Sequence, residues 1–426
     1  MSRRLLLSRL ASALGGIVCG SGVGRADEPS LLKADEEFLH GVIEILGTLW
    51  LRKPSQRDMF AGFYRGLADA LGAKYSKYFE TPIPVNDDDA AITIYLGTLF
   101  EISKSAPQDA QEFAVRVLME RSVNAYLGRE DQYAEFVSRT TARIVLDEKV
   151  SKGYVGIGVV LKKGEDGPVC YPISGSQASL EGVRKGDVLL TVNRREARFM
   201  TIYEAAHRLR GKPSSTVLIQ VRHGEVGAEE ETFEIERVKT DTAPVERRIV
   251  GDAHHLRLSK IEPAVVEALK TVLTDIGPRK EIVLDLRGNP GGDYMDAVRV
   301  AQLFLPKGVG ISKLRKLSGE KSSVSENIAP YVPSKFSILQ DGSTGSGAEL
   351  IIVALAAYKP LRTRTFGGRT FGKGVSQIQK QMDGKVGEEN EGLVVLTDAK
   401  MYGPNNEDWD DKGLEPDDEL PPEFAK

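Results

Sequence analysis

The sequence predicts a multidomain protein with α+β and α/β parts, and three observations lead to this fold class. The chain has 426 residues, which is too long for one ordinary domain. Its hydrophobic spacing changes from helical to strand-like alternation near residue 153. Beyond residue 240, strands, glycine turns and helices follow one another as in α/β proteins. We therefore expect a helical N-terminal region (27–150), a small β-rich domain (151–240) and an α/β core (241–426).

Residues 1–26 stand apart from these three regions. Two arginines come first, an apolar run interrupted by Arg9 comes next, and small residues lead up to Ala26. This layout is typical of an export signal, because the apolar run is too short to span a membrane and contains a charge. We expect a periplasmic or secreted protein, exported by the general secretory route or the twin-arginine route.

Composition argues against several function classes. The formal net charge is −4, and removing residues 1–26 takes away four arginines and no acid, which makes it −8. A chain this acidic, without a basic cluster, is a poor nucleic-acid binder. The histidines show no metal-ligand spacing, and they are His40, His207, His223, His254 and His255. We therefore expect no nucleic-acid partner, no metal and no other cofactor.

The first two regions differ in their hydrophobic pattern. In residues 27–150, apolar residues recur at helical spacing, as in Phe38, Val42 and Leu46. Such a helical region serves equally well as a packing layer or as an interface for a homo-oligomer or an adaptor protein. From residue 153 onward, short alternating runs and glycine turns predict strands, with a helix at 202–210.

The third region repeats one strand, turn and helix pattern. A compact apolar strand at 281–287 ends in a glycine turn at 288–292, and a helical pattern follows at 295–305. The same order recurs at 336–358. Such units place their ligands at the carboxyl ends of the strands, where both turns lie. The acidic segment 407–423 reads as a solvated tail.

A serine and a lysine are the candidate catalytic pair. Ser346 lies at the second turn, where the N–H groups that open a helix are unpaired. Lys373 follows in a glycine-flanked loop, with Gln377 four residues further on. The loop matches the start of a phosphate-binding motif, but Gly374 replaces the required Ser or Thr and a strand pattern follows, so we discount nucleotide binding.

Serine–lysine chemistry makes specific demands on this region. A serine hydroxyl needs a base, and a lysine can be that base only when it is neutral, a state that burial favours. Gln377 would orient the amine. The oxyanion would need two backbone donors, for which Gly347 and either Gly291 or Gly292 are the candidates. A surface lysine and a helix-capping serine remain the alternative interpretation at this point.

Residues 153–238 resemble a PDZ domain, through a Gly-Ile-Gly loop paired with the Lys-Gly-Asp-Val-Leu run at 185–189. The resemblance implies a site for a chain-terminal carboxylate and an added peptide strand. Its candidate residues are Tyr154, Val155, Gly156, Ile157 and Gly158. A small β domain without a ligand is the alternative.

The chain from about 115 to 420 resembles the carboxy-terminal processing (tail-specific) proteases of the S41 peptidase family. The motifs are the PDZ stretch and residues 284–292, 343–349, 370–377 and 413–417. The resemblance implies a ClpP/crotonase-like core, with Ser346 as nucleophile three residues before Glu349, Lys373 as general base and Gln377 in support. It also implies polypeptide substrates with free C-termini.

The sequence departs from the family pattern in four ways. Thr344 to Ala348 replaces the usual alternation of Ser and Ala, and Ala357 and Tyr358 stand where an aspartate often follows on the next helix. The 27-residue separation of Ser346 and Lys373 is slightly long, and the region before residue 115 is unlike the family. We expect an exported serine endopeptidase that captures C-termini through its PDZ domain. The alternative is a catalytically inactive PDZ adaptor on a protease scaffold.

Overall fold

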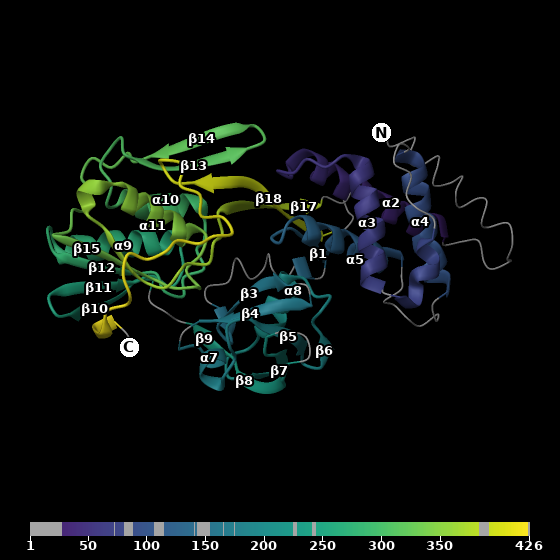
Figure 1. Cartoon of the computed structure of the whole chain (residues 1–426), viewed down its shortest axis with the longest axis horizontal. Coiled ribbons are helices and arrows are strands. Elements are labelled where there is room, and N and C mark those ends of the chain that lie inside the picture. The colour runs from purple at the N-terminus through teal and green to yellow at the C-terminus, as the bar shows by residue number, and fades with distance from the viewer. Residues whose placement is uncertain are drawn as a thin grey trace. The chain divides into compact units, whose positions relative to one another are not determined.

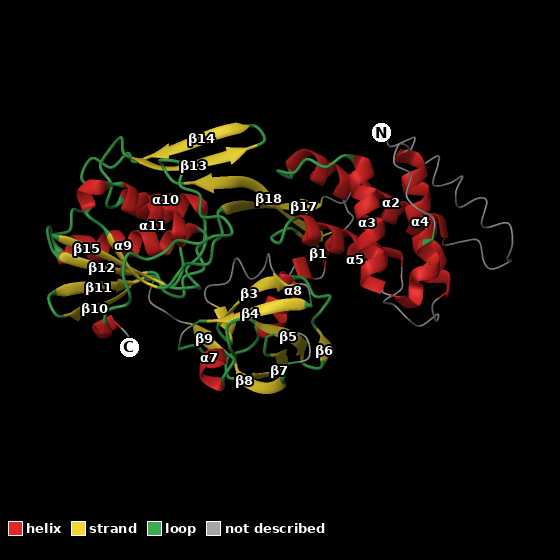
Figure 2. Ribbon diagram, in the orientation of Figure 1, coloured by secondary structure: helices red, strands yellow, loops and turns green. Residues whose placement is uncertain are grey.

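The computed structural model describes residues 28–71, 73–80, 88–105, 115–139, 141–142, 154–164, 166–173, 175–224, 228–240, 244–382 and 392–424. The expected export signal lies outside them. The chain forms two compact units, which we describe separately (Figures 1 and 2). The helical unit comprises Met1–Lys152, Arg198–His207 and Gln377–Thr397, and the core unit comprises Gly153–Ala197, Arg208–Ser376 and Asp398–Lys426. The division into 27–150, 151–240 and 241–426 stays a prediction.

Helices dominate the helical unit, as expected. They are α2 (Glu28–Leu49), α3 (Gln56–Leu71), η2 (Ala73–Phe79), α4 (Asp88–Ser105) and α5 (Val115–Glu130). Phe38, Val42 and Leu46 are all fully buried, which confirms the predicted apolar face. The short strand β1 (Glu135–Ser138) pairs antiparallel with the first part of β18 (Gly392–Tyr402), so the helices are joined to a sheet.

The first part of the core unit is an antiparallel β structure. Its elements are β2 (Tyr154–Gly156), β3 (Val159–Gly164), β4 (Gly167–Pro172), α7 (Gln177–Glu181), β5 (Asp187–Val192), β6 (Arg195–Glu196), β7 (Thr216–Arg222), β8 (Glu230–Glu236) and β9 (Val238–Thr240). The helix α8 (Ile202–Leu209) lies between β6 and β7 in the sequence, and its residues up to His207 belong to the helical unit. The main sheet has the order β3-β4-β5-β7-β8, with β6 on β5, and β2 pairs separately with β9. Among the described strands, β3 therefore forms one edge of this sheet.

A second sheet carries the candidate site. Its order is β10-β11-β12-β15-β16, and every pair except β10–β11 is parallel. The strands are β10 (Glu246–Val250), β11 (Ala253–Arg257), β12 (Glu281–Asp285), β15 (Lys335–Gln340) and β16 (Arg364–Gly367). Because β12 and β15 are parallel neighbours, the glycine turns after them lie at the same edge of the sheet.

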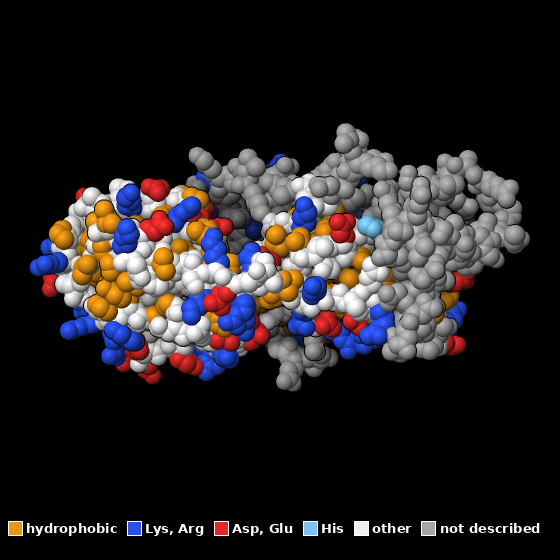
Figure 3. Space-filling view, turned by 90° about the horizontal axis from the view of Figure 1, so that it is seen from above, with side chains coloured by type: hydrophobic (Ala, Val, Ile, Leu, Met, Phe, Trp, Pro, Cys, Tyr) orange, Lys and Arg blue, Asp and Glu red, His pale blue; other side chains and the backbone are white. Residues whose placement is uncertain are grey.

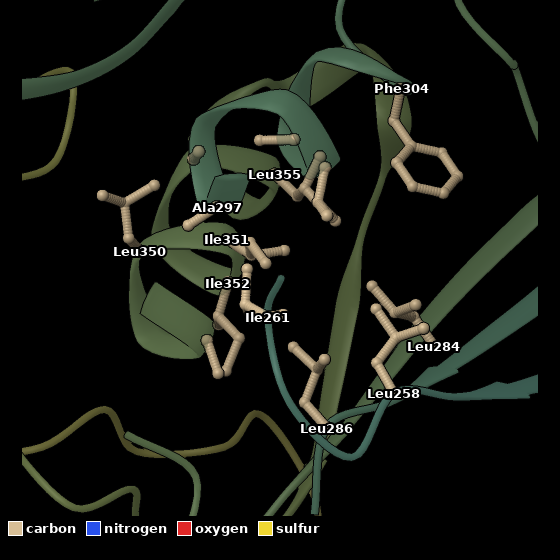
Figure 4. Close-up of a cluster of buried hydrophobic side chains, with 14 of the residues drawn as sticks. Leu258, Ile261, Leu284, Leu286, Ala297, Phe304, Leu350, Ile351, Ile352 and Leu355 are labelled. Atoms are coloured by element: carbon tan, nitrogen blue, oxygen red, sulfur yellow. The ribbon is translucent and has the colours of Figure 1, made fainter. Parts of the chain in front are cut away.

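Helices and an antiparallel ribbon complete the core unit. They are α9 (Pro263–Ile276), α10 (Tyr294–Gln302), β13 (Gly310–Lys316), β14 (Gly319–Val324), α11 (Gly347–Ala357), η4 (Lys359–Leu361) and η5 (Pro422–Phe424). The strand β17 (Val375–Met382) begins in the core unit and belongs to the helical unit from Gln377 onward. Ile351 and Leu355 of α11 belong to the same cluster of buried side chains as Leu284 of β12 and Leu286 just after that strand (Figure 4). Nine of the eleven α11 residues are buried, so the helix start carrying the serine is fixed by packing.

The acidic C-terminal segment differs from the expected solvated tail. Trp409 is fully buried. The expectation is wrong at this position because charge density alone does not reveal which apolar side chains the fold can bury. Figure 1 shows this segment, in yellow, running along the core unit to the C-terminus.

Candidate active site

The turn between β15 and α11 holds Ser346 in a rare backbone conformation. Its φ is 52° and its ψ is −117°, a region that residues other than glycine seldom adopt and that stores strain. The N–H of Ser346 donates to Glu349 Oε2 at 2.8 Å. The serine is therefore held at a sharp strand-to-helix turn, directly before Gly347, the first residue of α11.

Glu349 connects the serine turn to the loop that carries Lys373. The same Oε2 atom that accepts from Ser346 also accepts the N–H of Lys373 at 2.9 Å. The other oxygen, Oε1, accepts from the Thr370 hydroxyl at 2.5 Å and from the N–H of Gly372 at 2.7 Å. One carboxylate oxygen thus bridges the backbones of the candidate nucleophile and the candidate base.

Burial explains why this carboxylate is an effective connector. Glu349 is fully buried, and burial raises its pKa above the usual value even though its four hydrogen bonds act in the opposite direction. In a low-dielectric interior these bonds are strong, and losing any of them is costly. Sequence reasoning treated Glu349 only as a family marker. Glu349 is the one charged residue of an otherwise apolar helix, and this sequence feature was a usable signal of its role.

The glycine turn after β12 approaches the serine closely. A Cβ atom added at Gly291, where φ is 96°, would lie 2.8 Å from the Cβ of Ser346 and 2.7 Å from the nitrogen of Gly347. One added at Gly292 would lie 1.8 Å from the carbonyl oxygen of Ile261. Only glycine fits at either position. The three candidate oxyanion donors therefore lie in neighbouring turns, although the N–H of Gly291 already donates to Asn289 Oδ1 at 2.9 Å.

Asn289 holds these turns together and was not singled out from the sequence. It is fully buried, and its Nδ2 donates to the carbonyl of Leu258 at 2.8 Å. Its own carbonyl accepts the N–H of Gly345 at 2.9 Å. Because these partners follow three different strands, no local sequence signal identifies the role of Asn289.

A buried ionic cluster lies at the end of β12. Asp285 accepts two side-chain hydrogen bonds from Arg287, and its Oδ2 lies 3.0 Å from Nε2 of His255. Burial alone would raise the pKa of Asp285, but the bonds from Arg287 and His255 outweigh it and hold that pKa below the usual range. His255 is itself buried, with 2% of its surface exposed.

Gln377 belongs to the helical unit and Lys373 to the core unit. The side-chain amide of Gln377 donates to the carbonyl of Tyr133 at 2.7 Å. Its expected role of orienting the lysine amine stays a prediction.

The candidate carboxylate loop of the β domain runs from β2 to β3. Gly158 has a φ of 76°, and a Cβ atom there would lie 2.3 Å from the Cβ of Ser176. The carbonyls of Ile157 and Gly158 accept from Ala178 at 3.0 Å and Ile173 at 2.9 Å. These bonds fix the loop through its carbonyl groups. The peptide-binding assignment of residues 154–158 stays a prediction.

The described part of the chain contains no group of His, Cys, Asp and Glu that could hold a metal ion. Among its helices, none combines the length and the hydropathy that a membrane span requires. On the face in Figure 3, Lys and Arg side chains are interspersed with Asp and Glu.

Known proteins share both the sequence motifs and the fold. Residues 254–420 match the model of peptidase family S41. A probable CtpA-like serine protease of Staphylococcus aureus (strain bovine RF122 / ET3-1) is 31% identical over 300 residues, which cover 68% of this chain and 57% of that protein. The carboxy-terminal processing protease CtpA of Bacillus subtilis (strain 168) is 28% identical over 306 residues, covering 70% and 62%.

A solved structure agrees with this result at the level of the fold. The photosystem II D1 C-terminal processing protease has a TM-score of 0.62 at 21% identity, covering 92% of this chain and 94% of that one. Residues 254–420 therefore carry an S41 peptidase domain, and the chain shares the mixed α/β fold of the solved protease. It is similar to the carboxy-terminal processing proteases, although it spans less than two thirds of the length of the two relatives above.

Proposed function

We propose that the protein is an exported serine endopeptidase that cleaves polypeptides near their C-termini, with Ser346 as nucleophile and Lys373 as general base. The observation that carries the proposal is the Glu349 oxygen that accepts the backbone N–H groups of both residues. An unrelated capping serine and surface lysine would have no need of a shared, buried carboxylate. The S41 peptidase domain and the similarity to carboxy-terminal processing proteases support the same reaction.

The proposed reaction has two steps, acylation of Ser346 and hydrolysis of the acyl-serine. Ser346 Oγ bonds to the substrate carbonyl carbon while its proton moves to the neutral amine of Lys373. The oxyanion accepts hydrogen bonds from the N–H groups of Gly347 and Gly292 or Gly291. The C–N bond then breaks, the leaving amine takes the proton from Lys373, and an acyl-serine remains. Water then loses a proton to Lys373 and attacks the ester carbon. The bond from that carbon to Ser346 Oγ breaks, Oγ takes the proton back from Lys373, and the new C-terminal carboxyl group is released. Gln377 is our candidate for orienting the amine.

The β domain is proposed to act as a PDZ domain that captures the substrate C-terminus. The edge position of β3 and the carbonyl-anchored loop before it support this role, because a peptide can add to an open strand edge. The α/β part is proposed to be a ClpP/crotonase-like core. The helical unit is the candidate interface for a second copy or an adaptor.

Hydrolysis of fluorescein-labelled casein tests the proposed catalytic pair. Ser346→Ala and Lys373→Ala should each abolish turnover, whereas Ser343→Ala, a matched change in the same turn, should retain it. Full activity in either of the first two variants would rule out the assignment.

Peptide binding to the Ser346→Ala protein tests capture separately. Fluorescence anisotropy should show that a labelled peptide with a free carboxylate binds at least about tenfold more tightly than its C-terminal amide, because the loop would lose a charged ligand. Equal binding would refute the capture role. Binding without cleavage by the unmodified protein would instead favour the adaptor interpretation.

A further inference from the structure

The loop that carries Lys373 is held on a second side by residues 409–414, which we call the strap. The indole N–H of Trp409 donates to the carbonyl of Lys373 at 3.2 Å. The N–H of Asp411 donates to the carbonyl of Gly372 at 2.8 Å. Leu414 and Thr370 exchange two further bonds, at 2.7 and 3.1 Å. The backbone of the lysine loop is therefore enclosed between Glu349 and the strap.

Asp410 joins a carboxylate of the strap to this loop. Its Oδ1 accepts the N–H of Gly374 at 3.0 Å. A Cβ atom at Gly374 would lie 2.7 Å from the Cβ of Asp410, so the lysine loop and the strap are in direct contact at this point. This bond fixes the peptide unit directly after the lysine, as Glu349 fixes the one before it.

The surroundings of Asp410 favour a fixed carboxylate. The Nζ atom of Lys400 lies 3.7 Å from Asp410 Oδ2 and 3.2 Å from Asp408 Oδ2. Asp411 and Lys412 are the charged neighbours along the strap, and Lys412 pairs with Asp408 at 3.5 Å. Burial raises the pKa of Asp410 above its usual value. Because a half-buried acid is costly without partners, its bond to Gly374 is an organised feature of the fold.

We propose that Asp410 is a positioning residue for Lys373, acting as the hydrogen-bond acceptor that holds Gly374 and so sets the direction of the lysine side chain. This inference rests on the proposed serine–lysine reaction. Misplacing a catalytic group by about 1 Å can cost about 100-fold in rate. The effect should appear in kcat, with KM unchanged, because the strap is proposed to position the base and not the substrate.

Three variants of the full chain test the role of the acceptor. Asp410→Ala removes it, and kcat should fall about 10- to 100-fold. Asp410→Asn keeps an oxygen at the same place without the charge, and kcat should stay within about threefold. Asp410→Glu keeps the charge but moves the oxygens by one methylene group, and it should resemble Ala. Glu415→Ala, which removes an exposed partner of Arg369, is the control and should match the unmodified enzyme.

The outcomes separate this inference from the proposed function. An active Asp410→Ala enzyme, an active Glu variant beside an impaired Asn variant, or a change in KM alone would overturn the positioning role. Should the Ala variant fail to fold, the Asn and Glu variants decide the question. Unchanged activity in Lys373→Ala would overturn the function itself, whatever the Asp410 series shows.

Discussion

Replacing Glu349 probes the connection between the two segments that carry the proposed catalytic pair, Ser346 and Lys373. In Glu349→Gln, the amide NH₂ group must take the place of one carboxylate oxygen. If the NH₂ group faces Ser346 and Lys373, the backbone N–H groups of both residues lose their acceptor. If it faces Thr370 and Gly372, only the N–H of Gly372 loses its acceptor, because the Thr370 hydroxyl can turn and accept a hydrogen bond from the amide. We therefore expect the second orientation, with the bridge between nucleophile and base kept.

The structure sets the size of the effect. One buried N–H group without a partner costs about 1–3 kcal/mol, or a melting temperature lower by about 2–4 °C for each kcal/mol in a domain of this size. Glu349→Ala removes acceptors from three backbone donors and should cost more than about 3 kcal/mol. Its kcat should fall about 100-fold or more, while Gln should lose about tenfold or less.

Calorimetry and casein hydrolysis measure the two effects. Glu320→Gln, a change in a half-exposed ion pair with Arg315, is the matched control and should alter neither quantity. A free energy of unfolding for Glu349→Ala within about 1 kcal/mol of that of the unmodified chain would contradict this prediction, because the loss is smaller than the cost of one unpaired donor. Equal decreases in kcat for Glu349→Gln and Glu349→Ala would contradict it as well.

Three further predictions follow from particular residues. Ser346→Gly should be about 1 kcal/mol more stable than Ser346→Ala in thermal unfolding, because glycine relieves the positive φ; equal stability would argue against strain. Asn289→Ala should cost about 2–4 kcal/mol in urea unfolding, since it leaves the Gly291 N–H and the Leu258 carbonyl unpaired, and a cost below about 1 kcal/mol would contradict this. The bonds of His223 to Asp187 and Glu231 raise its pKa above 6.5, which NMR titration can measure. The resulting stabilisation is present below about pH 6.5 and disappears as the pH rises through the folded-state pKa, so His223→Gln should be most destabilising at acid pH and nearly neutral at pH 9.

Local patterns allowed the sequence to predict much of the core. The strands at β12 and β15 and the helix at α11 follow from short apolar runs and glycine turns, which depend on near neighbours alone. The sequence also named Ser346 and Lys373, because a serine at a strand-to-helix turn and a lysine between glycines are visible without a fold.

The helical unit was predictable in class but not in its contacts. Spacing gave the buried face of α2, whereas the pairing of β1 with β18 joins segments more than 250 residues apart. Such long-range pairing depends on packing that no short window of sequence encodes.

The tertiary structure alone decided how the turns that carry the proposed catalytic pair are held. The side chain of Glu349 reaches Lys373, that of Asp410 reaches Gly374, and that of Asn289 reaches Leu258, each across a long stretch of chain. A buried polar group must find a partner, but which partner it finds is fixed only when the strands are in register and the helices are packed. Sequence thus determined which residues could react, and the fold determined which buried side chains keep them in place.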